Sequence, residues 1–259
     1  MAITRLELAV DAALQTGKLL QDYFHKVNLQ STLKADQTLV TEADRAADRL
    51  IQEMILREFS DDQILSEEGN TIFPDNRHVW VIDPLDGTVN FSQGLNYWGV
   101  SIAHLVDGYP QTAALYFPET EELFSAVKGQ GAELNGVDLQ VSEKSSDALF
   151  SIFVHCSRMD QRYKVNLPYK RRSLGAAAYH LCLISKNTAI LAFESTPKIW
   201  DYAGSWLIVS EAGGVIESLG EKGPFPAQAG ADYQEISFSI IAAASDLLMA
   251  EAKENIIKL

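Results

Sequence analysis

An apolar run that ends in two closely spaced carboxylates constrains the fold of this chain more than any other stretch. Residues 79–82 read Val-Trp-Val-Ile, and Asp83 and Asp86 follow with Pro84 between them. Gly87 and Thr88 come next, in a segment that is able to open a helix. The pattern predicts a buried strand whose end carries two acids beside backbone N–H groups. Such an end suits a hard cation and an anionic ligand, whereas the alternative interpretation is an Asp-Gly hairpin turn.

Two helices are expected before this strand. Apolar residues recur at three- and four-residue steps over residues 4–25, which predicts an amphipathic helix. The polar residues 26–38 predict a loop or hairpin. Thr41-Glu42-Ala43-Asp44 fits a capping box, so a second helix is expected from Thr41 to about Glu58.

Short strands are expected on both sides of the central stretch. Residues 64–66 form a strand candidate that delivers Glu67 and Glu68. Three further runs, separated by turn residues, predict an antiparallel meander at residues 97–106, 111–117 and 122–127.

The second half of the chain alternates between strand and helix patterns. Strands are expected at residues 148–155, 189–193, 215–218 and 238–244, and helices at residues 174–186, 201–212 and 245–257. This alternation favours an α/β fold with helices covering a mixed sheet. We therefore expect an N-terminal α+β subdomain over residues 1–146, with an antiparallel-rich sheet, and a C-terminal α/β subdomain over residues 147–259, with a smaller mixed sheet.

The charge balance restricts the possible partners. With 21 basic and 35 acidic residues, the formal net charge is −14, which disfavours nucleic acid and anionic membrane surfaces as partners. An acidic protein that handles phosphate needs local positive charge, and bound divalent cations supply it.

Cysteine usage and the N-terminus bear on the compartment. Cys156 and Cys182 form no zinc spacing and no disulfide framework, so they are expected to be small core residues in a reducing compartment, the cytoplasm. Neither a signal peptide nor a membrane span is expected.

Each candidate acid has a structural explanation when considered alone. Asp44 completes the capping box, Glu67 resembles a solvated surface acid, Asp201 suits a helix N-cap, and Glu194 follows a strand at the surface. Considered together, the acids share a pattern, because they fall at predicted element ends, where sheet-based folds bind ligands. The set is Glu67, Asp83, Asp86 and Asp201. Oxygen ligands without His or Cys favour Mg²⁺ or Mn²⁺ over zinc, and two such ions would activate water and neutralise a phosphate.

Four blocks of the sequence resemble the inositol monophosphatase family. DPLDGTVNF at residues 83–91 is similar to the DPIDGT-x-NF signature, and WDYAGS from Trp200, followed by EAGG from Glu211, is similar to the second signature. LVTEAD at residues 39–44 and SEEG at residues 66–69 match two further blocks in the right order. Val89 stands where threonine is common, and Ser66 replaces a usual glycine. The second signature reads Ala-Gly-Ser rather than Ala-Ala-Gly. None of these departures removes a liganding oxygen.

The resemblance implies a layered αβαβα fold and roles for the matched positions. Glu67, Asp83 and the carbonyl of Leu85 would hold one Mg²⁺, Asp83, Asp86 and Asp201 a second, and Glu67 would help to hold a third. Thr88, oriented by Asp44, would help Glu67 to position and deprotonate the attacking water. The substrate contacts that it implies are Asp86, the backbone amides of Gly87 and Thr88, the loop Gly175-Ala176-Ala177, and Glu194 as the acid that binds a hydroxyl.

The resemblance further implies hydrolysis of a small phosphate monoester, with inositol 1-phosphate as the leading substrate, without a phosphoenzyme. It also implies sensitivity to Li⁺ and a homodimer. Fructose 1,6-bisphosphate (alone or in a dual activity), histidinol phosphate and a phosphoadenosine nucleotide are alternatives within the family, and a non-catalytic phosphate-ligand sensor or regulatory protein is the alternative outside enzymes. The position of a basic patch over residues 158–172 discriminates between these substrates. A bisphosphate is favoured if Arg171 or Arg172 lines the cleft, and a monophosphate polyol is favoured if the patch faces solvent.

Overall fold

A computed structural model of the chain describes residues 3–29, 33–142, 150–220 and 222–259, with the side chains of residues 27–40 outside the described part. The helices are α1 (Arg5–Leu29), α2 (Leu33–Glu58), α3 (Thr88–Ser92), α4 (Met159–Arg162), α5 (Ala177–Ser185), α6 (Ile199–Glu211) and α7 (Asp246–Asn255). The strands of the first sheet are β1 (Gln63–Ser66), β2 (His78–Asp86), β3 (Gly99–Val106), β4 (Tyr109–Phe117), β5 (Glu122–Val127), β6 (Gly131–Leu134) and β7 (Val137–Asp138). The later strands are β8 (Ile152–His155), β9 (Tyr163–Val165), β10 (Lys170–Arg172), β11 (Leu191–Glu194), β12 (Val215–Ser218), β13 (Ile240–Ala243) and β14 (Ile256–Lys258).

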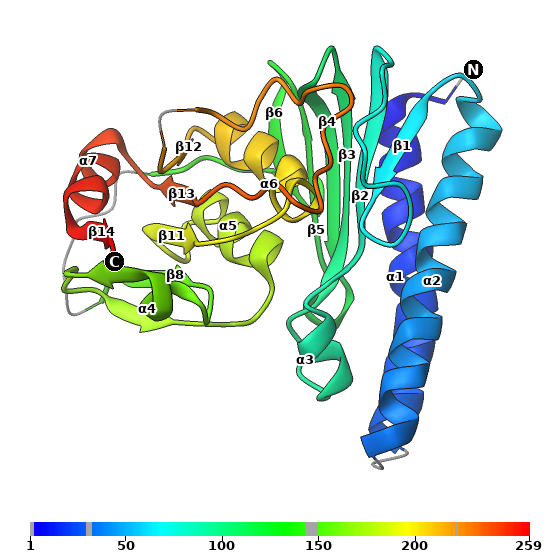
Figure 1. Ribbon diagram of the computed structural model, residues 1–259, viewed down its shortest axis with the longest axis horizontal. Coiled ribbons are helices and arrows are strands. Elements are labelled where there is room, and N and C mark those ends of the chain that lie inside the picture. Colours follow the sequence, from blue (N-terminus) through cyan, green and yellow to red (C-terminus); the bar gives the residue numbers. More distant parts are fainter. Residues whose placement is uncertain (1–2, 30–32, 143–149, 221) are drawn as a thin grey trace.

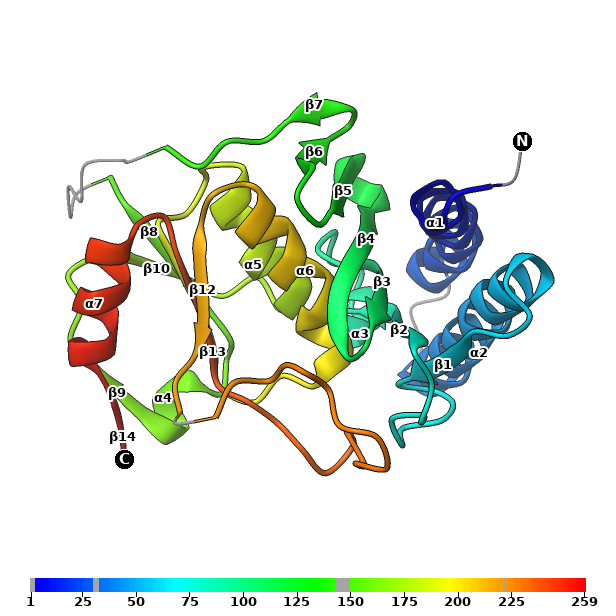
Figure 2. The same cartoon turned by 90° about the horizontal axis from the view of Figure 1, so that it is seen from above.

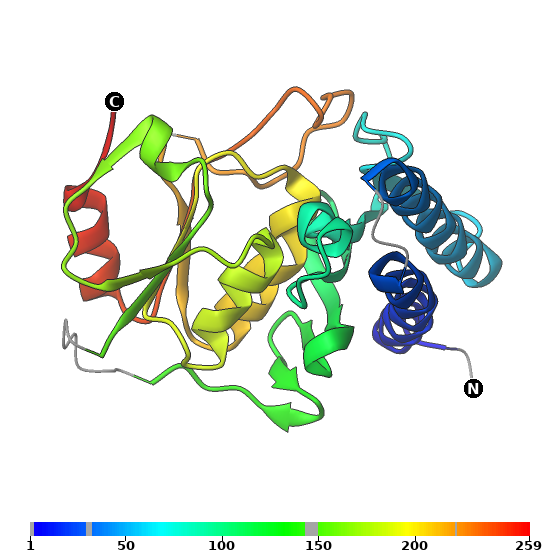
Figure 3. The same ribbon diagram turned by 90° about the horizontal axis from the view of Figure 1, so that it is seen from below.

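The elements stack in five layers, which confirms the expected αβαβα fold. The pair α1 and α2 covers one face of a seven-stranded sheet, and α5 with α6 fills the space between that sheet and a five-stranded one (Figures 1 and 2). Helix α7 covers the outer face of the smaller sheet (Figure 2). Seen from below, α5 and α6 again lie between the two sheets (Figure 3).

The two sheets differ in strand direction. The first runs in the order β1 to β7 and is antiparallel apart from the parallel pair β1 and β2. The second has the order β10-β8-β11-β13-β12 and is mixed. Both sheets match the expectation from the sequence. A short pairing of β14 with β9 was not expected.

Strand β2 is apolar throughout because both of its faces are buried. Trp80 and Ile82 pack into the core formed with α1 and α2, while Val79 and Val81 pack into the core formed with α5 and α6. All four side chains are at most 1% exposed. Successive side chains of a strand point to opposite faces, so a continuous apolar run is what a central strand between two helical layers requires.

The end of β2 differs from the expectation. The strand does not end at Asp83 but continues to Asp86, with a shift of its register against β3 between these two residues. The irregularity accommodates Pro84, which has no N–H group to donate to a ladder. The left-handed backbone of Gly87, at φ 88°, then turns the chain into α3, so the Asp-Gly pair opens a helix rather than a hairpin.

Helix α2 begins earlier than predicted. It starts at Leu33, and α1 extends to Leu29, so the expected loop is wrong for residues 26–29 and 33–38, while residues 30–32 lie outside the described part. Thr41 lies inside the helix rather than at its cap. No glycine or proline occurs between α1 and Thr41 to stop a helix. A capping-box pattern is therefore compatible with a helix interior when nothing breaks the helix before it.

The predicted C-terminal elements are present with different ends, except that residues 256–257, expected in the last helix, belong to β14. The short elements α4, β9 and β10 were not predicted. Helix α6 starts at Ile199, so Asp201 is not an N-cap but lies in the first turn, where its carboxylate accepts the N–H of Lys198 at 2.7 Å. Ser245 caps α7 as expected and accepts the N–H of Leu248 at 3.4 Å. The expected subdomain boundary near residues 145–147 lies outside the described residues, so the division at residue 146 stays a prediction.

Among the residues that the structure describes, no helix has both the length and the apolar character needed to cross a bilayer.

Candidate active site

Three carboxylates from separate segments converge at the junction of the first sheet and the middle helix layer. Glu67 follows β1, Asp83 lies in β2, and Asp201 lies in the first turn of α6. Each offers an oxygen within 4.8 Å of the others. The pairing of β1 with β2 positions Glu67, whose N–H donates to the carbonyl of Ile82 at 3.4 Å. The structure therefore brings together three of the four acids that the sequence singled out as ligands.

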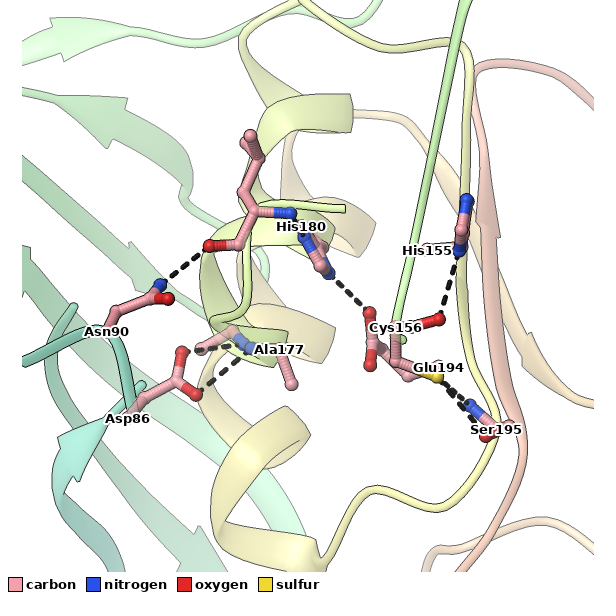
Figure 4. A network of polar contacts seen from close by, with 10 residues as sticks. Asp86, Asn90, His155, Cys156, Ala177, His180, Glu194 and Ser195 are labelled. Atoms are coloured by element: carbon pink, nitrogen blue, oxygen red, sulfur yellow. Dashed lines mark hydrogen bonds and ion pairs between the residues drawn. The ribbon is translucent and has the colours of Figure 1, made fainter. Parts of the chain in front are cut away.

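The fourth acid, Asp86, lies beside this group and contacts α5. Its two carboxylate oxygens accept the N–H groups of Ala177 and Ala178 at 3.0 and 2.9 Å (Figure 4). Backbone N–H groups at a helix start have no acceptor within the helix, and they favour a negative charge. Asp86 therefore connects the end of β2 to the start of α5, and it fixes both sides of the site relative to each other.

The acids raise one another's pKa values. Burial, followed by the charges of Glu68 and Glu67, raises the pKa of Asp44 to about 8. Burial and the charge of Asp86 raise the pKa of Asp201 to about 7. Burial raises the pKa of Asp86 to about 7, although the amide of Ala177 opposes the shift. The pKa of Asp83, which is 1% exposed, is also raised by burial and by Glu67. Carboxylates this close together repel one another when ionised, so a bound cation stabilises their charged form.

The chemistry of the cluster fits Mg²⁺. All of its donor atoms are carboxylate oxygens, which hard divalent cations prefer. The sequence predicted a donor set of this kind. Asp44 adds a buried carboxylate oxygen, Oδ1, that has no hydrogen-bond partner within the described part of the chain. A buried acceptor without a donor is unfavourable, so such an oxygen fits a site whose positive charge comes from a bound ion or its waters.

Thr88 and Leu85 contact each other directly. The hydroxyl of Thr88 donates to the carbonyl of Leu85 at 3.1 Å, so the structure pairs Thr88 with a proposed ligand oxygen and not with Asp44. Gly87 is packed so closely that a Cβ would lie 2.8 Å from the carbonyl oxygen of Tyr97. Only glycine fits this turn, because the backbone is left-handed and the space is filled.

A cleft of about 600 Å³ adjoins the cluster through Asp201. Asp86 and Glu194 also line it, and so do Gly175 and Ala177 of the predicted substrate loop. Ala176 of the same loop is completely buried and supports Gly87 instead. Val89, Leu95 and Tyr97 supply apolar lining from α3 and the segment after it, whereas Cys156, Arg158 and Thr196 come from the loops that follow β8 and β11.

Glu194 is buried, so the alternative that it is an exposed surface residue at the end of a strand is wrong. It is 3% exposed, and one carboxylate oxygen lies 2.6 Å from Nδ1 of His180 (Figure 4). The other ring nitrogen, Nε2, accepts the N–H of Leu174 at 2.8 Å. A ring nitrogen that accepts an N–H carries no proton, so His180 is neutral and donates from Nδ1. Glu194 therefore faces the cleft as a carboxylate oriented by a neutral donor.

Two residues of the site were not singled out from the sequence. His180 lies one turn after Ala177 in α5, and helical spacing placed it on the same face, but nothing local indicated its partner. Asn90, in the signature block, donates to the carbonyls of Tyr97 and Leu174 at 2.5 and 2.6 Å. It thereby joins the segment after α3 to the loop before α5, and Figure 4 shows the bond to that loop.

Both cysteines were expected to be small core residues, which is confirmed for Cys182 and wrong for Cys156. Cys182 is completely buried in the core. Cys156 is only partly buried and lines the cleft, where its sulfur lies 3.2 Å from the hydroxyl of Ser195 (Figure 4). Burial and the nearby charge of Glu194 raise the pKa of the Cys156 thiol.

Converging carboxylates at the junction of a sheet and a helix layer, with a cleft beside them, are the arrangement that metal-dependent hydrolases of phosphate esters use. The sequence model of the inositol monophosphatase family matches residues 3–258, and the chain belongs to that family. It is therefore a phosphatase, and enzymes of this family are generally Mg²⁺-dependent.

Curated relatives cover most of the chain under two different names. One is Nus factor SuhB of Pasteurella multocida, which is 34% identical over 224 residues, 82% of this chain and 84% of the relative. Another is a histidinol-phosphatase of Chlorobaculum parvum, which is 35% identical over 221 residues, 81% of this chain and 83% of the relative.

Solved structures share the whole fold. An inositol monophosphatase from Anabaena superposes with a TM-score of 0.74 at 27% identity, covering 96% of this chain and 93% of that one. The IMPase of Thermotoga maritima gives a TM-score of 0.77 at 26% identity, covering 97% and 96%.

Proposed function

We propose that this phosphatase hydrolyses inositol 1-phosphate with Mg²⁺, by direct attack of water and without a phosphoenzyme. One observation carries the proposal: the converging oxygens of Glu67, Asp83 and Asp201 adjoin, through Asp201, a cleft that Glu194 also lines. The cluster suits the phosphate end of a substrate, and Glu194 suits its alcohol end.

The proposed metal ligands are five residues of the chain. Glu67, Asp83, Asp86, Asp201 and the carbonyl of Leu85 would hold two or three Mg²⁺ ions, for which Mn²⁺ is a substitute. When bound, the ions supply positive charge for the phosphate and lower the pKa of a coordinated water.

Positioning of the water and the phosphate falls to the turn between β2 and α3. Thr88 and Glu67 orient the attacking water, and Glu67, whose charge interacts with that of Asp44, accepts its proton. The amides of Gly87 and Thr88, at the start of α3, donate to the phosphate oxygens. Phosphorus is attacked in line, and the alcohol leaves toward the cleft.

The charges of the cleft favour a neutral polyol as the leaving alcohol. Glu194 and Asp86 are acceptors for hydroxyl groups. Arg171 is engaged with Asp160 at 2.5 Å, and Arg172 donates to the carbonyl of Arg171 at 2.8 Å. Neither arginine is among the residues that line the cleft. By the criterion set from the sequence, this arrangement supports a monophosphate rather than a bisphosphate.

A sugar bisphosphate, fructose 1,6-bisphosphate above all, is the second candidate because of Arg158. This arginine lines the cleft beside Thr196, whose hydroxyl lies 3.5 Å from its guanidinium. Its side chain is exposed and has room to turn toward a second phosphate. A dual activity would use Glu194 for one substrate and Arg158 for the other.

A phosphate-release assay separates the candidates. The panel is inositol 1-phosphate, fructose 1,6-bisphosphate, histidinol phosphate and a phosphoadenosine nucleotide, each with Mg²⁺, with Mn²⁺ and with chelator, and with Li⁺ added to test inhibition. We expect inositol 1-phosphate to have the highest kcat/KM, and only with a divalent cation. A higher kcat/KM for any other member would overturn the substrate assignment, and activity in chelator would overturn the role of the metal.

The remaining expectations concern partners and compartment. We propose a homodimer in the cytoplasm that binds neither membrane nor nucleic acid, the last on the basis of the net charge of −14. Sedimentation in the presence of Mg²⁺ tests the dimer. A filter-binding assay with RNA at low salt tests the proposed absence of nucleic-acid binding. The test matters because some relatives are named Nus factors.

A further inference from the structure

The residue before Glu67 makes a contact that none of the proposed catalytic roles uses. Ser66 is 1% exposed, and its hydroxyl donates to Oδ1 of Asp48 at 2.5 Å. Asp48, 6% exposed, lies in α2 one turn after Asp44. The other oxygen of Asp48 accepts the amide of Gln52 at 2.7 Å. Two donors therefore satisfy this buried carboxylate, as its burial requires.

The same residues enclose the turn that carries Glu67. The N–H of Ser66 donates to the carbonyl of Asn70 at 2.9 Å, and the N–H of Gly69 donates to the carbonyl of Ser66 at 3.3 Å, so the turn is closed on itself. The amide of Gln52 lies over Gly69, at 3.3 Å from where a Cβ would stand. Helix α2 thus holds the turn from one side, while the N–H of Glu67 donates to β2 on the other side.

We propose that Ser66 and Asp48 are positioning residues that fix Glu67 in the metal site and so set the affinity for the divalent cation. Ser66 anchors the backbone directly next to the ligand, and Asp48 belongs to the helix that carries Asp44. The contact therefore fixes the separation between Glu67 and Asp44, whose charges interact. Residues that orient ligands without touching the metal contribute strongly to metal affinity. This inference rests on the proposed role of Glu67 as a ligand.

The proposed contact depends on a hydroxyl group, which glycine lacks. Where the family resemblance places a usual glycine, this chain has the donor that Asp48 accepts. A chain with glycine at this position needs another way to hold the turn.

The test is direct metal binding, which requires no substrate. Mn²⁺ binding to the metal-stripped protein is measured by electron paramagnetic resonance for the wild type and for Ser66→Ala. We expect the Kd for Mn²⁺ to rise about tenfold in Ser66→Ala, as for other residues that orient metal ligands. The Mg²⁺ concentration for half-maximal activity should rise in parallel, with the KM for the phosphate ester unchanged.

Two further variants separate positioning from stability. Ser185→Ala removes another buried hydroxyl, which donates to the carbonyl of Cys182 at 2.7 Å at the far end of α5. It should lower the Tm without changing the Kd for Mn²⁺. The double variant Asp48→Asn with Gln52→Glu keeps an acceptor for Ser66 and reverses the second bond, so it should retain near-normal affinity.

A Kd for Mn²⁺ in Ser66→Ala within twofold of the wild-type value would overturn the proposal, as would an equal rise in Ser185→Ala. A loss of affinity in the double variant would overturn it as well, because the charge of Asp48 would then matter more than the hydrogen bond. If no variant and no wild-type protein binds Mn²⁺, the metal site itself is wrong, which is a distinct result.

Discussion

Glu194 and His180 form a buried pair in which a neutral imidazole donates from Nδ1 to the carboxylate at 2.6 Å. The pair joins β11 to α5 and leaves the second oxygen of Glu194 for the cleft (Figure 4). Because the other imidazole nitrogen is engaged by Leu174, the ring is held from both sides. The orientation of Glu194 therefore depends on a residue that does not itself need to touch the substrate.

Loss of this donor should weaken substrate binding. In His180→Ala the KM for inositol 1-phosphate should rise roughly tenfold with little change in kcat, because a hydrogen bond to a charged group contributes about 1.5–3 kcal/mol. The exposed His25 in α1 supplies the matched control, His25→Ala, which should leave both constants unchanged. A fall in kcat at constant KM would show that His180 acts on the chemical step instead.

Asp83 should be indispensable for turnover and unfavourable for the stability of the metal-free protein. Asp83→Asn should lower kcat at saturating Mg²⁺ by about a thousandfold or more, because the residue is shared between both proposed ions. Its metal-free form should have a higher Tm than the wild type, since a buried charge among like charges is removed. Thermal scans with chelator and with Mg²⁺, alongside the exposed control Asp138→Asn, check both points. Near-normal turnover would contradict the two-metal assignment.

The metal-free protein should lose stability as the pH rises. Folding raises the pKa of Asp44 to about 8 and those of Asp86 and Asp201 to about 7. The unfolded chain releases these protons near pH 4, at about the usual aspartate value. Between about pH 4 and pH 8 the folded state therefore binds more protons, and the free energy of unfolding falls with rising pH.

Mg²⁺ should oppose this loss, because it replaces the protons. Tm measured at pH 5.5 and pH 8 should fall with pH in chelator and fall far less in saturating Mg²⁺. Binding of the ion displaces protons, so its affinity should increase over the same range. A Tm that is independent of pH in chelator would show that the acids are not mutually destabilising.

Thr88 should affect the chemical step more than binding. Thr88→Ala should lower kcat about a hundredfold or more, the range for loss of a group that helps proton transfer, while KM changes little. Thr88→Ser keeps the hydroxyl that donates to Leu85 and should recover most of the activity. An increase in KM at constant kcat would instead make Thr88 a substrate contact.

Gly175 tests the packing of the substrate loop. Its φ is +86°, and a Cβ would lie 2.6 Å from Oδ1 of Asn90. Gly129 has a similar φ of +76° with nothing within 4 Å, so Gly129→Ala carries only the backbone strain, which is about 1–2 kcal/mol. Gly175→Ala should lower the Tm further than this control and raise KM. Equal Tm values for the two variants would show that the Asn90 side chain moves away from the new Cβ without loss of stability.

Much of the site was accessible from the sequence because element ends have local signals. An apolar run of β2, followed by Asp83, Pro84 and Asp86, located the central acids and the turn into α3. The capping-box pattern from Thr41 to Asp44 identified a real helix but misplaced its start. Such patterns are compatible with more than one boundary, since no glycine or proline forces the chain to stop.

By itself, the sequence determined most of the strands and helices, though not α4, β9, β10 or β14, as well as the burial of β2 and the concentration of oxygen ligands at element ends. Those follow from side-chain periodicity and local backbone chemistry, which act over a few residues. Only the tertiary structure decided which acids meet. It grouped Glu67 and Asp83 with Asp201, tied Asp86 to α5, buried Glu194 against His180, and joined Ser66 to Asp48. Each of these contacts links segments far apart in the chain, so it depends on the packing of helix layers against two sheets, which no local pattern encodes.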